Sequence, residues 1–365
     1  MVGFSSSFVV VLAGLTAVGA TRAQAASGLL AVCLTQAAGM VWLSLRHRTP
    51  ISLAWSTPGA ALLISTGTVA GGWPAAVGAF VLTGVLVVVT GLVPWLGALV
   101  GRIPTSLARA MLAGVLVPIC LEPVTGFASS PALVGPVIAA WLVVHRLARR
   151  WAVPAALVVA LVIVLLRGGS SVHPADLLPT LAWTTPSWTV AAVVSIALPL
   201  YVVTMASQNV PGVAVMASFG YRVPWGESMT ATGLGTVLGA PFGGHAINLA
   251  AITAALSAGP LAGPDRSRRW IATTTAAATY VVLGLAAAAL AALVAAAPGD
   301  VIPAAAGLAL LGTLGSALAG ALAEEDGREA AAVCFLVAAS GITVLGVGAA
   351  FWALLAGLAL RPLLR

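Results

Sequence analysis

Long apolar stretches follow one another along almost the whole chain of 365 residues. Hydrophobic residues make up 61% of the chain and charged residues only 7%, too few to cover the surface of a water-soluble domain. A helix needs about 20 apolar residues to cross the hydrocarbon core of a bilayer, and it satisfies its own backbone hydrogen bonds there. The sequence therefore predicts an all-α polytopic membrane protein.

The apolar stretches divide into fourteen predicted spans joined by short connections. The predicted spans are 4–21, 27–45, 50–67, 71–91, 104–121, 127–144, 151–166, 189–218, 226–241, 242–258, 270–295, 302–321, 329–342 and 344–360. With the N-terminus in the cytoplasm, all the arginines except Arg22 and Arg167 fall at cytoplasmic ends. This bias predicts that both termini are cytoplasmic. Because the arginines are scattered, the net charge of +7 indicates topology and not nucleic-acid binding.

The longest polar connection, residues 168–187, divides the predicted spans into seven and seven. It predicts a first repeat at 1–167, a periplasmic linker at 168–187 and a second repeat at 188–365. Because seven is odd, the second repeat enters the membrane in the opposite direction, as in the inverted repeats of secondary transporters.

The third span of each repeat is a poor match to a continuous helix. Pro58 disfavours helix at the residue before it and suits a first helical turn, so we predict extended structure at 51–56 and a half-helix at 58–67. In span ten, residues 241–247 are poor helix formers, and we predict a half-helix from Asn248 to Leu256. Matched broken spans indicate a transporter site, where half-helix N-termini attract anions. The alternative is that Pro58 and the pair Gly243-Gly244 are packing kinks in ordinary helices.

Three polar side chains lie at mid-membrane depth beside these broken spans. Gln208 and Asn209 precede Pro211 in span eight, and His245 lies in span ten. Polar groups at this depth pair with one another or face a cavity. His245 is the candidate for proton coupling, because an imidazole gains and loses a proton near neutral pH. The alternatives are hydrogen bonding between helices for the amides and a neutral core histidine.

Motifs of other function classes are missing from the sequence. It has no phosphate-binding loop, nucleophile elbow or metal-ligand cluster, and Cys33, Cys120 and Cys334 lie singly in apolar stretches. The sequence therefore predicts no enzyme, no metal and no organic cofactor.

Several long motifs carry a resemblance to a known family. They are AWSTPGAALL at 54–63, RIPT at 102–105, SQNVPGVAV at 207–215, GYR at 220–222 and APFGGHAINLAAIT at 240–253. In these segments, and nearly end to end, the chain resembles the benzoate/proton symporter family of bacteria (BenE type). That family is similar in architecture to nucleobase/ascorbate and sulfate-type transporters. The resemblance implies an inner-membrane protein with a core domain of spans 1–4 and 8–11 and a gate domain of spans 5–7 and 12–14.

The resemblance also implies a site. Nucleobase relatives carry acidic residues at the positions of Gln208 and His245, whereas an amide and an imidazole suit a carboxylate. The implied function is proton-coupled uptake of benzoate or a similar aromatic monocarboxylate by alternating access, with His245 binding the anion as imidazolium and Trp55 and Phe242 covering the ring. The expected substrate-binding residues are Ser56, Thr57, Pro58, Gly59, Gln208, Asn209, Gly243, Gly244, His245 and Asn248.

The alternatives to this function are transport of another small anion or a nucleobase-like solute, and a passive anion channel. Relatives of this architecture also form homodimers, so a homodimer in the lipid bilayer is a further expectation.

Overall fold

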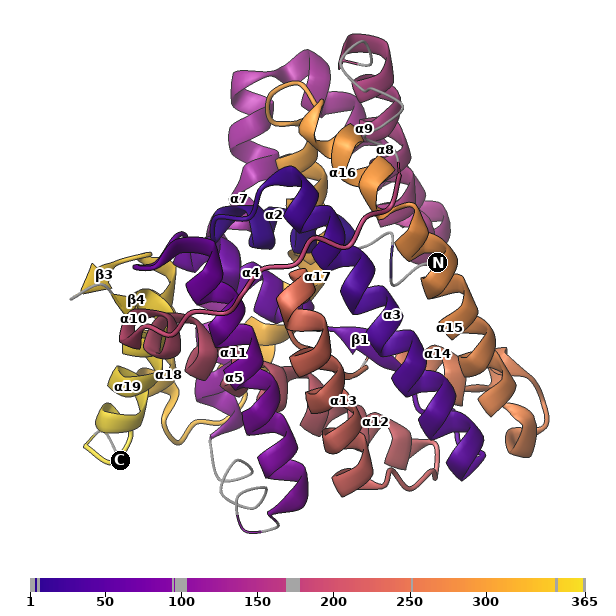
Figure 1. Ribbon diagram of the computed structural model, residues 1–365. Coiled ribbons are helices and arrows are strands. Elements are labelled where there is room, and N and C mark those ends of the chain that lie inside the picture. Colours follow the sequence, from indigo (N-terminus) through magenta and orange to yellow (C-terminus); the bar gives the residue numbers. More distant parts are fainter. Residues whose placement is uncertain are drawn as a thin grey trace.

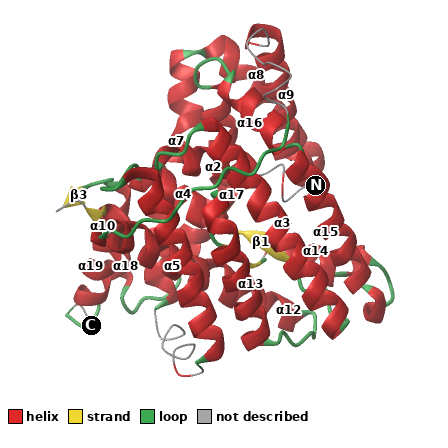
Figure 2. Cartoon of the chain, in the orientation of Figure 1, coloured by secondary structure: helices red, strands yellow, loops and turns green. Residues whose placement is uncertain are grey.

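The computed structural model describes residues 4, 7–93, 95, 104–168, 178–250, 252–344 and 347–363. The described chain is mostly helical, with two pairs of very short strands (Figures 1 and 2). The first half contains α2 (Phe8–Ala17), α3 (Arg22–His47), β1 (Leu53–Trp55), α4 (Thr57–Thr66), α5 (Gly72–Leu92), α7 (Thr105–Ser129), α8 (Pro131–Ala148), the 3-10 turn η1 (Arg149–Trp151) and α9 (Ala152–Gly168).

The second half has a more broken path. It contains α10 (Val190–Ala192), η4 (Val193–Ala197), α11 (Leu198–Thr204), η5 (Met205–Asn209), α12 (Val210–Ser218), α13 (Trp225–Gly239), η6 (Ala240–Phe242), β2 (Ile247–Leu249), α14 (Ile252–Ala258), η7 (Pro260–Ala262), η8 (Arg266–Arg268), α15 (Trp270–Leu285), α16 (Ala287–Ala295), α17 (Val301–Ala321), α18 (Arg328–Ala339), β3 (Thr343–Val344), β4 (Val347–Gly348) and α19 (Ala349–Leu360).

Six helical stretches of the described residues are long and apolar enough to cross a membrane, and the pair α15–α16, bent by 51°, makes a seventh. One of the six stretches, residues 131–167, contains two helices, α8 and α9. The backbone leaves the helical region at Ala148, and α9 then packs against α8. A multi-pass membrane protein is therefore confirmed. Every predicted span contains a helix, but the shorter ones fall below this length, so the fourteen-span count and the inverted repeat stay predictions.

Helix packing is most extensive within two groups of elements. In one group α3 packs on α15, α5 on α13 and α2 on α4; in the other α7 packs on α17 and α18, and α18 on α19. Fewer contacts join the groups, among them those of α7 with α4 and with η5. The predicted division into a core and a gate domain that move against each other stays a prediction.

The stretch from α10 to α12 contains two π-helical turns, η4 and η5. Each one ends two residues before a proline, Pro199 and Pro211 respectively. Proline has no N–H and so leaves a carbonyl of the preceding turn without its helical partner, which favours a local change of helix type. Turns of this kind often occur at functional sites, because they redirect side chains and expose carbonyls.

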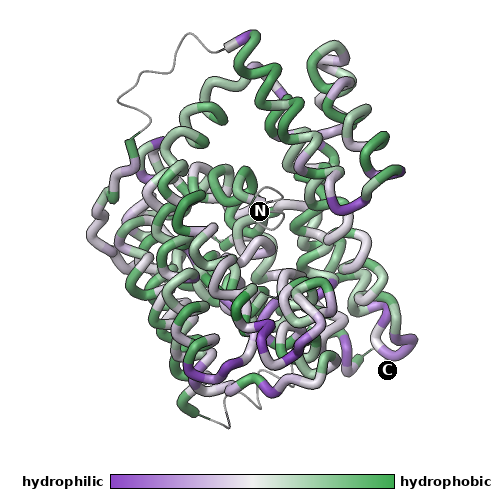
Figure 3. The backbone as a smooth tube through the Cα atoms, turned by 90° about the vertical axis from the view of Figure 1, so that its right-hand side faces the viewer, coloured by the Kyte–Doolittle hydropathy of each residue, from purple (hydrophilic) through white to green (hydrophobic). Residues whose placement is uncertain are grey.

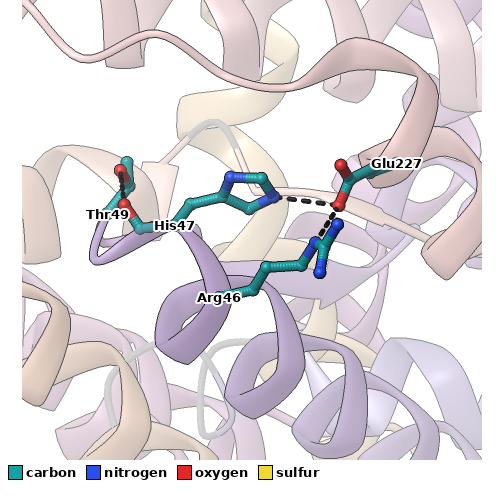
Figure 4. A network of polar contacts seen from close by, with 4 residues as sticks. All are labelled: Arg46, His47, Thr49 and Glu227. Atoms are coloured by element: carbon teal, nitrogen blue, oxygen red, sulfur yellow. Dashed lines mark hydrogen bonds and ion pairs between the residues drawn. The ribbon is translucent and has the colours of Figure 1, made fainter.

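Hydrophilic residues gather at one end of the molecule, at the bottom of Figure 3. At that end Glu227, on the first turn of α13, binds the last residues of α3 (Figure 4): its Oε2 accepts from Arg46 Nε at 2.9 Å and lies 3.0 Å from His47 Nε2. Because these side chains are partly exposed, the ion pair contributes little stability. Its main effect is to fix the end of α3 against the start of α13.

Candidate functional site

The two predicted broken spans meet at the centre of the molecule, where Figure 2 shows β1 surrounded by helices. Strand β1 pairs antiparallel with β2, with Ala54 opposite Asn248. Two further backbone bonds extend the ladder, from Ser56 N to Ala246 O at 2.8 Å and from Ala250 N to Ser52 O at 2.9 Å. The pairing satisfies extended backbone that would otherwise be exposed at membrane depth, which is the condition for such backbone to exist there.

The first broken span follows the predicted plan, with β1 leading directly into α4. Ser56 is the N-cap: its Oγ accepts from Gly59 N at 3.1 Å and lies 2.8 Å from Thr204 Oγ1, and its carbonyl accepts from Ala60 N at 2.8 Å. Pro58 has no N–H to offer. This capping leaves only the N–H of Thr57, so the free N–H groups expected at this N-terminus are mostly used within the chain.

The second broken span departs from the prediction. Helix α14 begins at Ile252, whereas Asn248 lies inside β2 and is fully buried. With its amide oriented to satisfy both atoms, Asn248 accepts from Ser56 N at 3.0 Å and donates to Leu249 O at 2.8 Å. Strand pairing therefore overrides the helix-forming tendency of this segment, and the prediction of a half-helix from Asn248 is wrong.

Asn209 and His245 are also buried, and both contact the strand pair. Asn209 Oδ1 accepts from Leu249 N at 2.8 Å, and its Nδ2 lies 3.0 Å from Met205 Sδ. His245 is 1% exposed, and its Nε2 lies 3.2 Å from the carbonyl oxygen of Ser56. Its Nδ1 has no hydrogen-bond partner in the described part of the chain. Both side chains therefore hold the strands and the start of α4 together.

A cavity of about 550 Å³ lies between the first half-helix, the π turn η5 and helices α7 and α17. Its polar lining includes Gln208 and Ser207 of η5, and Arg109 of α7. Its other lining residues include Pro58, Leu112, Ala206, Pro211, Gly312, Ala317, Ala319 and Gly320. The volume lies in the range of small-molecule sites, which combine apolar walls with a few polar groups.

Comparison with known proteins identifies the family. A family model described as "Benzoate membrane transport protein" (BenE) matches residues 1–363. The chain belongs to the benzoate membrane transport protein family. It is 40% identical over 360 residues to "Inner membrane protein YdcO" of Escherichia coli, covering 98% of this chain and 91% of that protein. It is 28% identical over 338 residues to the "Benzoate membrane transport protein" of Acinetobacter baylyi, covering 91% and 84% respectively.

Two solved structures share the fold of this family member. The transmembrane domain of a cyanobacterium bicarbonate transporter, BicA, gives a TM-score of 0.56 at 14% identity and covers 97% of both chains. SLC26A9 gives a TM-score of 0.63 at 15% identity, with 99% of this chain and 64% of that chain covered. At such identities the likeness shows the fold alone. Together with the family it establishes a multi-pass membrane protein with a transporter fold.

Of the residues expected to bind substrate, only Pro58 and Gln208 line the cavity. Thr57 and Gly59 flank Pro58, and Ser56 is the N-cap residue of α4. Gly243, at φ 89°, lets the chain turn where its backbone packs against α3. The remaining expected residues are absent from the lining and form the scaffold around the strands: Asn209, Gly244, His245 and Asn248.

The two aromatic residues expected to cover a substrate ring lie elsewhere. Trp55 donates from Nε1 to Ser7 Oγ at 3.0 Å and packs edge-on against Tyr280. Phe242 packs against Trp183 with ring centroids 5.3 Å apart. Neither residue lines the cavity, whose walls are mainly aliphatic.

The charged residue of this cavity is one that sequence reasoning did not identify as part of the site. The sequence groups Arg109 with the arginines that indicate topology, but the structure places it in the lining of the cavity. The available signal was its position inside an apolar span, since an arginine within a span faces a cavity or a partner.

Proposed function

We propose that this family member takes up benzoate or a similar aromatic monocarboxylate together with a proton, by alternating access. The observation that carries the proposal is the cavity at the start of α4, which brings an amide, three hydroxyl side chains and a guanidinium together with aliphatic walls. Membership of the benzoate family and the name of the Acinetobacter baylyi relative support the substrate class.

The chemistry of the lining matches an aromatic monocarboxylate. Gln208 and Ser207 offer hydrogen-bond donors, and the N-terminal end of α4 behind Pro58 carries a partial positive charge. Leu112 and Ala317 offer apolar surface to a ring. Alternating access would then require the α7 and α17 side of the cavity to move relative to α4 and η5.

We propose His245 as the proton carrier, acting through Ser56 and not by direct contact. A carbonyl oxygen only accepts, so Nε2 of neutral His245 carries the hydrogen that points to Ser56 O. Its Nδ1 then keeps a free lone pair and takes up the proton without breaking that bond. The added charge would lie directly behind the cap of α4 and strengthen anion binding at its N-terminus.

This coupling has a simple energetic consequence. One proton and one monoanion together carry no net charge, so the pH gradient alone drives their movement. One pH unit supplies about 1.4 kcal/mol, which corresponds to roughly tenfold accumulation of the substrate.

Uptake of labelled benzoate into proteoliposomes tests the proposal. Accumulation that needs an inward proton gradient and collapses with a protonophore is the expected result. Accumulation of other small anions or nucleobases, with no benzoate uptake, would show that the substrate is not benzoate. Equilibration without accumulation would indicate a passive channel.

Substitution of His245 tests the coupling. His245→Gln should abolish gradient-driven accumulation while leaving downhill equilibration of benzoate, because the neutral amide takes up no proton. His145, which packs on the ring of Trp141 away from the cavity, provides the control as His145→Gln. Gradient-driven accumulation at the wild-type level in His245→Gln would exclude His245 as the coupling residue.

A further inference from the structure

Arg109 lies near the start of α7 and lines the same cavity as Pro58 at the start of α4. A glycine of the neighbouring helix makes this position possible. At Gly320 of α17 an added Cβ would overlap the Arg109 guanidinium, so the absence of a side chain there leaves the space that Arg109 occupies.

The guanidinium of Arg109 takes part in no hydrogen bond or ion pair with the described residues. Some other arginines are bonded, among them Arg46 to Glu227, and Arg269 to the carbonyl oxygens of Ala258 and Gly263. A charged side chain within a span is costly unless it has a partner or faces water. The Arg109 side chain is exposed, so water solvates its charge. Arg109 is also the one charged residue among the described residues that line the cavity, so an anion that enters the cavity meets its formal positive charge there.

The other described residues of the lining lack the formal charge that an anion needs. Ser56 already caps Gly59 and Ala60, so the N-terminus of α4 offers its dipole and little else. Beside it lie the amide of Gln208 and the hydroxyl of Ser207, whose Oγ is buried without a hydrogen-bond partner. Arg109 adds a full positive charge to this neutral, donor-rich lining.

We propose that Arg109 binds the substrate carboxylate from the α7 side of the cavity while Gln208 and the α4 N-terminus hold it from the other side. This inference rests on the proposed function and assigns the residue that neutralises the anion. A bound carboxylate then bridges the two groups of packed helices, because α7 belongs to one group and α4 to the other. Bidentate pairing is what a planar guanidinium offers a carboxylate and what a lysine ammonium does not.

The experiment compares variants of Arg109 and its neighbour with matched controls. Arg109→Gln should raise the Kd for benzoate by about 10- to 100-fold, since a charge-assisted hydrogen bond is lost, and Arg109→Lys should recover only part of the affinity. Gly320→Ala should weaken binding without changing any charge, because it displaces Arg109. The controls are Arg222→Gln, in an exposed turn, and Gly315→Ala, whose added Cβ meets open space on the same helix.

Binding to purified protein in nanodiscs and uptake in proteoliposomes are both measured, with neutral benzamide as the uncharged probe. A loss of benzoate affinity in Arg109→Gln and Gly320→Ala, with both controls and benzamide binding unchanged, supports the proposal. Wild-type affinity in Arg109→Gln overturns it while leaving the proposed function intact.

If the wild type neither binds nor transports benzoate, the proposed substrate is wrong, and the role of Arg109 needs a test of its own. That test measures the thermal shift of the wild type and of Arg109→Gln with formate, acetate, bicarbonate and salicylate. An anion that stabilises the wild type but not Arg109→Gln supports the anion site, and the absence of any such anion overturns it.

Discussion

The two broken spans share one plan and differ in how their helices begin. In the first, β1 leads directly into α4, Ser56 caps the helix, and Pro58 reaches the 550 Å³ cavity. In the second, β2 is buried along its whole length and α14 begins only at Ile252. Matching positions in two halves of a chain therefore need not carry equivalent chemistry.

The difference follows from what each strand faces. Strand β2 is held by Asn209 and by Thr236, whose Oγ1 accepts from Ile247 N at 3.1 Å. Its neighbour His245 in turn supports the carbonyl of Ser56. The second broken span thus fixes the first, and the first forms the wall of the cavity. Variants of the two spans should accordingly divide into those that lower stability and those that change binding.

The largest expected effect on stability comes from Asn209. Asn209→Ala removes the acceptor for Leu249 N and leaves that N–H buried without a partner, which costs about 1–3 kcal/mol. The unfolding midpoint in detergent should fall accordingly. The adjacent Gln208→Ala is the control, because Gln208 lines the cavity and should change the KM for substrate with little effect on the midpoint. Equal midpoints for the two variants would contradict the assignment of Asn209 to the scaffold.

A smaller effect is expected at the cap of α4. Ser56→Ala removes the acceptor for Gly59 N and the partner of the Thr204 hydroxyl, with an expected cost of about 1 kcal/mol for the lost cap. The same variant should weaken substrate binding, because the helix end at the cavity frays. Ser56→Thr keeps the capping oxygen and serves as the control. A midpoint and an affinity that both match the wild type in Ser56→Ala would show that the cap does not order the site.

The smallest effect is expected at the start of α14. Thr253 lies on its first turn and borders a separate cavity of about 520 Å³, and its Oγ1 has no hydrogen-bond partner among the described residues. Thr253→Val should leave the unfolding midpoint and benzoate uptake unchanged or slightly raise the midpoint, because it removes an unsatisfied buried hydroxyl. A clear loss of uptake in this variant would mean that the two half-helix starts are functionally alike after all.

The sequence predicted the local features that rest on local chemistry. Proline at position 58 fixes an extended residue before it and a helix after it, and the structure has β1 and α4 there. Gln208, predicted as a polar group at membrane depth before Pro211, lies in the π turn η5 and lines the cavity. The motif resemblance also identified the family.

The sequence could not predict which of the polar residues near these spans face the cavity. Asn209 and Gln208 are neighbours with similar amides, and only packing against Leu249 assigns one to the scaffold and the other to the cavity. The prediction of where α14 begins was wrong for the same reason, because the pairing of Asn248 with Ala54 joins segments far apart in the chain.

The sequence by itself determined that this protein is a multi-pass membrane protein with two broken spans, because hydropathy and the backbone limits of proline act within a few residues. Only the tertiary structure decided where the cavity lies and that Arg109 lines it. Its walls come from four separate segments, and the space for the guanidinium depends on Gly320, more than two hundred residues further along the chain. Contacts of this kind arise from packing between helices, so they cannot be predicted from the hydrophobic periodicity of a single helix.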